Sequence, residues 1–313
     1  MENLLLTLLQ NYSQVVDGIL AVTVCDRGGL IITSYNAGED ELLLGAIATY
    51  VDSYIERVKQ EFNVESNFFN ITTTENKKFA FCSMGSHSIL TTIAEPTSSD
   101  VELQVLSKHV ALKIELILGG NEQVSLEIPE IVKILSKTRA GKLASGDFSS
   151  KLILTGDFKV GKTSLIQRFV TNRFQENYMS TLGVEISKKV LELAPDTNFR
   201  FLIWDIGGQK MLAKPGFYNG ANAAFIVIDR TRPETLESVP RWYREIKKTV
   251  IDDIPVVIVA NKSDLIGKIA LTEEIIKEES QKLGYHYILT SAKTGENVPE
   301  VFTYIAYKIL ENM

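Results

Sequence analysis

The stretch that most restricts what this 313-residue chain can fold into is GDFKVGKTS, residues 156–164. It follows an apolar run, KLILTGD, and opens a segment of helical pattern, GKTSLIQRFVTN. A glycine-rich turn between a strand and a helix directs backbone N–H groups and the positive helix end toward an anion. The sequence therefore predicts a phosphate-binding loop made of Gly156, Phe158, Lys159, Val160, Gly161, Lys162, Thr163 and Ser164.

Two further segments supply what a triphosphate and its metal need. Asp205, in WDIGGQ, ends a strand and suits a water on Mg²⁺, while Gly208 offers a bare N–H to a γ-phosphate and Gln209 can orient an attacking water. YMSTLGVE adds Thr181, with Tyr178 among the nucleotide contacts. The predicted metal ligands are Thr163, Thr181 and Asp205, and the predicted catalytic residues are Gln209, Lys162 and Thr181.

The identity of the base follows from NKSD, residues 261–264, at the end of an apolar strand. The Asp264 carboxylate accepts two hydrogen bonds side by side, which matches the N1–H and exocyclic amine of guanine. Adenine lacks this donor pair and would leave the carboxylate unpaired. We expect Lys262 to lie along the base, Asn261 to brace the loops, and Ser291, Ala292 and Lys293 to complete the site, with the Ala292 N–H on guanine O6.

The part of the chain around these motifs, residues 149–313, alternates strands and helices. Near-continuous apolar runs such as AAFIVID and IPVVIVAN are typical of buried parallel strands. SKKVLELA and FRFLIWDI, separated by PDTN, predict a hairpin, and helices are expected at 234–250, 272–283 and 297–312. This pattern predicts a doubly wound α/β domain with one antiparallel edge.

The preceding section, residues 1–122, predicts a smaller α/β domain. Its order is helix, two strands, helix, three strands and a closing helix, with a hairpin signal at DRGG, residues 26–29. The glycines at 119 and 120 mark its end. Residues 123–148, with a helix after Pro129 and several basic side chains, are interpreted as a helical linker.

Together these motifs resemble the Ras superfamily of small GTPases, closest to its Rab-like branch, over residues 149–313. The resemblance implies a P-loop nucleotide-binding fold, GTP or GDP and Mg²⁺ as cofactors, GTP hydrolysis, and effector and regulatory proteins as partners. Two features depart from the family pattern. Phe158 and Lys159 replace small residues beside the γ-phosphate, and the segment after Gln209 is shorter.

Residues 1–122 resemble the Roadblock/dynein light chain family, which implies a platform that dimerises, either with a second copy or with another Roadblock-family protein. A longin- or profilin-like platform, or an unrelated α+β domain, remains an alternative. The fused order motivates the hypothesis that this platform regulates or assembles the GTPase, since fusion raises the effective concentration of their contact.

Composition narrows the remaining choices. A net charge of −6 gives no general attraction to nucleic acid, and the two cysteines, Cys25 and Cys82, fit a reducing, cytoplasmic environment. Glu2 excludes N-myristoylation and the last residues hold no prenylatable cysteine, so we expect membrane attachment only through partners.

The leading hypothesis is a GTP-binding switch with slow intrinsic hydrolysis. The alternative is a scaffold whose GTP site is structural and hardly turns over, a reading that Phe158 favours. An ATP-using kinase or motor is disfavoured by NKSD.

Overall fold

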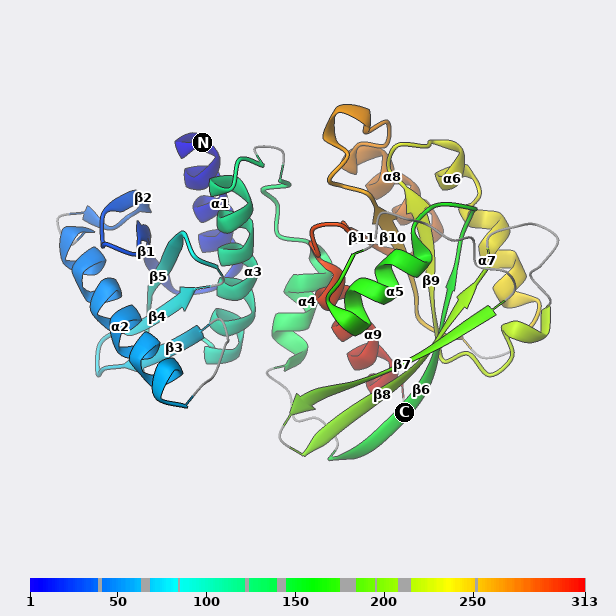
Figure 1. Cartoon of the computed structure of the whole chain (residues 1–313), viewed down its shortest axis with the longest axis horizontal. Coiled ribbons are helices and arrows are strands. Elements are labelled where there is room, and N and C mark those ends of the chain that lie inside the picture. The colour runs from blue at the N-terminus through cyan, green and yellow to red at the C-terminus, as the bar shows by residue number, and fades with distance from the viewer. Residues whose placement is uncertain are drawn as a thin grey trace. The chain divides into compact units, whose positions relative to one another are not determined.

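The structure is a computed structural model that describes residues 1–38, 41–62, 68–83, 85–121, 124–139, 145–174, 184–194, 196–207, 215–250 and 253–312. The chain divides into two compact units, Met1–Gly141 and Lys142–Met313 (Figure 1). Among the described residues, no helix combines the length and apolar character that crossing a membrane requires.

The first unit contains the elements in the order expected from the sequence. They are α1 (Glu2–Val15), β1 (Ile19–Asp26), β2 (Ile31–Tyr35), α2 (Glu41–Phe62), β3 (Phe68–Thr73), β4 (Lys78–Ser83), β5 (Ser88–Ala94), α3 (Asp100–Leu118) and α4 (Glu130–Arg139). The described strands form one antiparallel sheet in the order β2-β1-β5-β4-β3. The antiparallel α/β architecture of this unit is therefore clear, whereas the Roadblock resemblance stays a prediction.

Alternation along the strands divides the core of this unit between two sides of the sheet. Val22 and Val24 of β1 belong to the cluster that contains Leu8 of α1, whereas Cys25 of the same strand packs in a cluster with Ala48 of α2. Side chains that follow each other in a strand point to opposite faces, so one strand serves both clusters. Helices α1 and α3 thus cover one face and α2 covers the other (Figure 1).

Helix α4 belongs to the first unit and is not a separate linker. Ile128 and Val132 join the core cluster beneath α3. The ammonium of Lys113, which is 2% exposed, donates to the Glu127 carbonyl at 2.7 Å and ties the segment before α4 to α3. The first unit accordingly extends to Gly141, beyond the glycines at 119 and 120 that mark the expected boundary, and the next strand begins at Gly146.

The second unit is a mixed sheet covered by helices on both faces. Its elements are β6 (Gly146–Thr155), α5 (Lys162–Thr171), β7 (Val184–Ala194), β8 (Thr197–Ile206), β9 (Ala223–Asp229), α6 (Glu234–Glu237), α7 (Val239–Lys247), β10 (Val256–Asn261), α8 (Glu273–Leu283), β11 (His286–Leu289) and α9 (Val298–Glu311). The order is β11-β10-β9-β6-β8-β7, parallel except for β7. The predicted doubly wound sheet with one antiparallel edge is confirmed.

Two layers of side chains hold these helices to the sheet. Phe225 of β9 meets Phe302 of α9, which stacks on Phe169 of α5 with ring centroids 3.8 Å apart. The next residue along β9, Ile226, belongs to the opposite cluster with Trp242 of α7. Because β6, β8, β9 and β10 run parallel, their carboxyl ends meet at one edge of the sheet, where α/β proteins bind ligands.

The helix expected at 234–250 is two helices, α6 and α7, which adjoin at Ser238. Pro240 occupies the first turn of α7, a position that tolerates proline because its N–H would have no partner within the helix. Trp242 of α7 then contacts the loop that follows β6, where its indole N–H donates to Asp157.

Candidate functional site

The turn after β6 brings the backbone too close to neighbouring strands for any side chain at its two glycines. A Cβ on Gly156, whose φ is +138°, would lie 2.2 Å from the Val227 carbonyl oxygen of β9. A Cβ on Gly161, whose φ is +100°, would lie 2.3 Å from Nδ2 of Asn261. Both positions therefore require glycine for space and for backbone conformation. These contacts explain the spacing of the glycines in the motif.

Lys162, the first residue of α5, lies under this turn. Its side chain is buried, with 6% of the residue exposed, and its ammonium donates to the carbonyls of Gly156 at 2.9 Å and Asp157 at 3.0 Å. Burial lowers the pKa of Lys162 to about 8, against the opposing attraction of Asp205 and Asp157. The side chain of Lys162 is thus held in place by hydrogen bonds to its own loop.

Thr163 and Asp205 bring two oxygen atoms together at the ends of α5 and β8. The Thr163 hydroxyl donates to Oδ2 of Asp205, a carboxylate that is 2% exposed. A hydroxyl and a carboxylate are hard oxygen donors of the kind that Mg²⁺ prefers, so this pair fits the metal that the sequence predicts. Thr181, the third predicted ligand, lies outside the described residues.

Asn261, the last residue of β10, connects the three loops of the site. Its amide nitrogen donates to the Val160 carbonyl at 3.0 Å, and its Oδ1 accepts from the Ala292 N–H at 3.1 Å. Asn261 is 1% exposed, so both bonds are shielded from water. The bracing role expected for Asn261 matches this placement.

The contact of Ala292 differs from the one assigned from the sequence. Its N–H, which was expected to meet guanine O6, donates to Asn261 in the structure. A base contact from this N–H therefore requires that the bond to Asn261 be shared or exchanged. The reason is geometric: Asn261 ends β10 and Ala292 follows β11, the parallel strand beside it, so the Asn261 side chain lies within reach of the Ala292 N–H.

Asp264, in the loop after β10, is oriented by Ser291 in the loop after β11, at the same edge of the sheet. The Ser291 hydroxyl donates to Oδ1 of Asp264 at 2.6 Å and accepts from the Thr294 N–H at 3.1 Å. Arg168 of α5 in turn donates to the Ala292 carbonyl at 2.8 Å and to the Lys293 carbonyl. The carboxylate predicted to read the base is thus fixed by a chain of hydrogen bonds.

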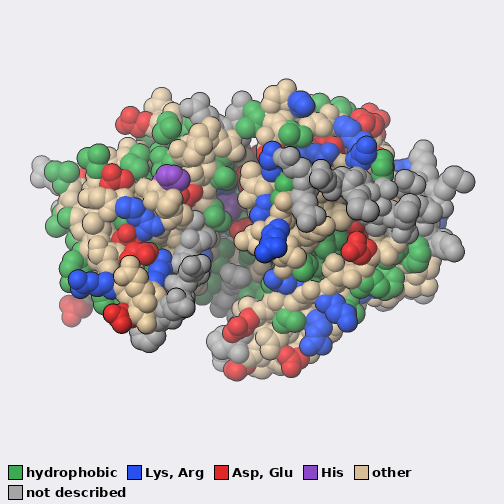
Figure 2. Space-filling model, viewed as in Figure 1, with side chains coloured by type: hydrophobic (Ala, Val, Ile, Leu, Met, Phe, Trp, Pro, Cys, Tyr) green, Lys and Arg blue, Asp and Glu red, His purple; other side chains and the backbone are tan. Residues whose placement is uncertain are grey.

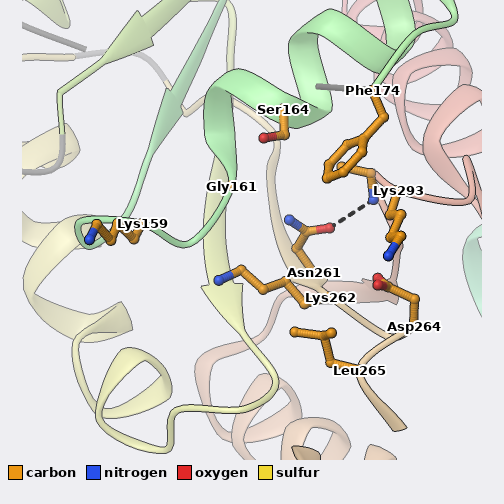
Figure 3. Close-up of a pocket in the computed structure, with 10 residues that line it drawn as sticks. Lys159, Gly161, Ser164, Phe174, Asn261, Lys262, Asp264, Leu265 and Lys293 are labelled. Carbon is orange, nitrogen blue, oxygen red and sulfur yellow. Dashed lines mark hydrogen bonds between the residues drawn. The ribbon is translucent and has the colours of Figure 1, made fainter. Parts of the chain in front are cut away.

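These residues surround a cavity of about 430 Å³ (Figure 3). It is lined by Lys159, Gly161, Ser164, Phe174, Asn261, Lys262, Asp264, Leu265, Ala292 and Lys293. Phe174 and Leu265, which the sequence did not single out, provide apolar surface among polar groups, a combination that suits a flat heterocyclic base. The volume lies within the usual range for small-ligand sites.

Some predicted residues lie elsewhere or outside the described residues. Thr163 and Asp205 lie at the phosphate end and do not line this cavity, and Ser291 contributes through Asp264. Tyr178, Thr181, Gly208 and Gln209 all fall outside the described residues.

Sequence reasoning missed a group of side chains behind the phosphate loop. The Asp157 carboxylate accepts from Arg241 at 2.5 Å and from the Trp242 indole at 2.9 Å. The Phe158 carbonyl accepts from Arg232 at 2.8 Å. These donors lie on or before α7, and no motif spacing relates them to the loop; only the fold brings them there.

Comparison with known proteins points to the same half of the chain. The model of the Ras family matches residues 151–311, a range that contains every described residue of the site. The GTP-binding protein ypt1 of Schizosaccharomyces pombe is 33% identical over 169 residues, which cover 53% of this chain and 83% of ypt1.

The buried position of Lys162 predicts proton uptake when a polyphosphate binds. An anion raises the pKa of a neighbouring ammonium, so a lysine that titrates near pH 8 in the free protein gains a proton on binding above that pH. We expect uptake near one proton at about pH 9 and little at about pH 7, with affinity falling as pH rises above about 8. Calorimetry in buffers of different ionisation enthalpy measures this uptake, and equal uptake at both pH values would contradict the prediction.

Proposed function

The chain belongs to the Ras family through residues 151–311, and we propose that it is a guanine-nucleotide switch that binds GTP and GDP with Mg²⁺ and hydrolyses GTP slowly. The relative ypt1 is itself described as GTP-binding. The proposal is carried by the position of Asp264, whose carboxylate lines the cavity and is oriented by Ser291.

In this proposal Asp264 accepts hydrogen bonds from N1–H and the exocyclic amine of guanine, while the Lys262 stem packs along the base. Phe174 and Leu265 provide the apolar surface that removes the base from water. Lys293 and Ser164 border the same cavity. A base without the donor pair would leave the Asp264 carboxylate without hydrogen bonds from the ligand. An unpaired polar group of this kind excludes a wrong base more strongly than a difference in size does.

At the other end of the site, Lys162 exchanges its bonds to loop carbonyls for phosphate oxygens. Thr163 and Asp205 would hold Mg²⁺, which when bound offsets charge on the phosphate oxygens. We assign Thr181 as a further metal ligand, Gly208 as an N–H donor to the γ-phosphate, and Gln209 as the residue that orients the attacking water.

A scaffold whose GTP site is structural and hardly hydrolyses GTP is a second candidate. Phe158 favours it, because its bulk adjoins the position of the γ-phosphate and its carbonyl is bound by Arg232. A purified chain that keeps its GTP unchanged for many hours would support this second candidate against the first.

We also propose that the first unit associates with a second copy of itself through α2. The helix exposes a row of apolar side chains: Leu42, Leu43, Ile47, Tyr50, Tyr54 and Val58, of which Leu42 is 79% and Tyr50 78% exposed. Several of these positions are three or four residues apart and so share a face. Figure 2 shows hydrophobic side chains along the rim of the first unit where Figure 1 places α2. Contiguous exposed apolar surface of this kind is typical of interaction sites.

We propose a cytoplasmic location, with attachment to membranes made through partner proteins. Both cysteines, Cys25 and Cys82, are buried thiols, and burial raises the pKa of Cys25 to about 11 and of Cys82 to about 12. Thiols held in this protonated form fit a reducing compartment.

Substitution of the base-reading carboxylate tests the nucleotide assignment. In Asp264→Asn, the amide donates where the carboxylate accepted, so the affinity ratio of GDP to xanthosine diphosphate should fall by about 100-fold or more. Competition with fluorescent GDP measures the ratio. Asp253→Asn is the matched control, because Asp253 is exposed and pairs only with Lys247 among the described residues. Unchanged guanine preference in Asp264→Asn would refute the base assignment.

The assigned role of Gln209 predicts a separation of turnover from binding. Gln209→Leu should slow single-turnover GTP hydrolysis by about tenfold or more, because the water loses its orienting group, while GTP affinity changes little. Gln167→Leu, on the exposed side of α5, is the control with the same chemical change. Equal rates in the Gln209 and Gln167 variants would remove Gln209 from the mechanism.

The proposed α2 interface predicts a dimer that charge disrupts. Light scattering should give the full chain twice the monomer mass, and Tyr50→Glu with Tyr54→Glu should give the monomer mass, because two carboxylates cannot be buried without partners. Gln10→Glu with Gln14→Glu places the same charges on exposed positions of α1 as the control. A monomeric wild-type chain would contradict the proposal.

A further inference from the structure

The buried carboxylate of Asp229 connects the two ends of the site. Asp229 ends β9 and its side chain is 1% exposed. Its Oδ2 accepts from the Lys262 ammonium at 2.7 Å and from Nε of Arg232 at 3.2 Å. Its Oδ1 accepts from the Thr231 N–H at 2.9 Å and from the Thr231 hydroxyl at 2.7 Å. None of the nucleotide-site motifs described above includes this aspartate.

The two cations bound to Asp229, Lys262 and Arg232, contact opposite ends of the proposed nucleotide site. The stem of Lys262 lines the base cavity, as Figure 3 shows. The other side of Arg232 donates to the Phe158 carbonyl of the phosphate loop at 2.8 Å. One carboxylate oxygen therefore connects a residue of the base site with a residue of the phosphate loop.

The geometry makes this connection stiff. Lys262, directly after β10, has a left-handed backbone conformation with φ of +69°, and from there its ammonium reaches Asp229. Burial raises the pKa of the Asp229 carboxyl, but hydrogen bonds from Lys262 and Thr231 bring it below its ordinary value. The aspartate thus stays ionised at neutral pH, and both cations are held by charge-assisted bonds.

We propose that Asp229 is a positioning residue that sets how long a guanine nucleotide stays bound. It holds Lys262 along the base and, through Arg232, holds the Phe158 side of the phosphate loop. Loss of the carboxylate frees both ends at once, and the nucleotide leaves faster. This inference rests on the proposed guanine-nucleotide site and adds to it a determinant of the release rate.

The release of fluorescently labelled GDP from the full chain, followed after addition of excess GDP, tests the inference. Asp229→Asn keeps the shape but removes the charge, and release should be about tenfold faster or more, the effect of losing a charge-assisted hydrogen bond. Asp253→Asn is the matched control, because it neutralises an exposed carboxylate that pairs with a lysine far from the site. Release at the wild-type rate from Asp229→Asn would overturn the inference.

A double-mutant cycle separates positioning from a general loss of stability. Lys262→Met and Arg232→Met remove the two cations, which the structure joins through Asp229. Their effects on the release rate should be non-additive by about threefold or more when Asp229 is present, and additive in the Asp229→Asn background. A purely structural aspartate would leave the two effects additive in both backgrounds, and this result would also overturn the inference.

The outcomes also distinguish this inference from the proposed function. If the wild-type chain takes up no labelled GDP, the nucleotide proposal fails and the inference fails with it. If the wild-type chain binds GDP and the Asp229 variant releases it no faster, only the inference fails. Should Asp229→Asn lose its fold, Arg232→Met decides alone, since it keeps the Asp229–Lys262 pair: faster release supports the connection and an unchanged rate overturns it.

Discussion

The second unit depends on a close approach between Gly161 and Asn261. With no side chain at Gly161, the amide of Asn261 reaches the Val160 carbonyl, and its oxygen reaches the Ala292 N–H. One buried amide thereby joins the loops that follow β6, β10 and β11. This contact therefore links the phosphate end of the cavity to its base end.

Residues that belong to short motifs could be predicted from the sequence. Gly156, Lys162 and Asp264 belong to short patterns with a chemical reason for each spacing, and the structure places them around one sheet edge. Arg232 and Arg241 could not be predicted, because their partners in the phosphate loop lie 74 and 84 residues away and no local pattern encodes that pairing. Asp229 could not be predicted either, because no motif relates it to Lys262. Arg232 precedes α6 and Arg241 lies on α7, and only the fold brings both to the loop.

The domain boundary shows a similar limit. Glycines after α3 and the basic residues of α4 indicated a linker, yet Ile128 and Val132 are buried in the first core. The apolar face of a short amphipathic helix does not reveal which surface it covers, and the basic residues describe only its other side. The element order of the first unit could be predicted from the alternation within its strands and the turn signals between them.

The bonds of Lys162 to its own loop have a consequence for selectivity among anions. The ammonium already bonds to two carbonyl oxygens, and an anion that binds it must displace them. For a small anion such as inorganic phosphate, the net gain in binding free energy is therefore small. A longer chain of phosphates that also meets Thr163 and the backbone amides gains several contacts for the same displacement. Because Lys162 is already bonded to its own loop, the site favours long phosphate chains that contact the whole turn over small single anions.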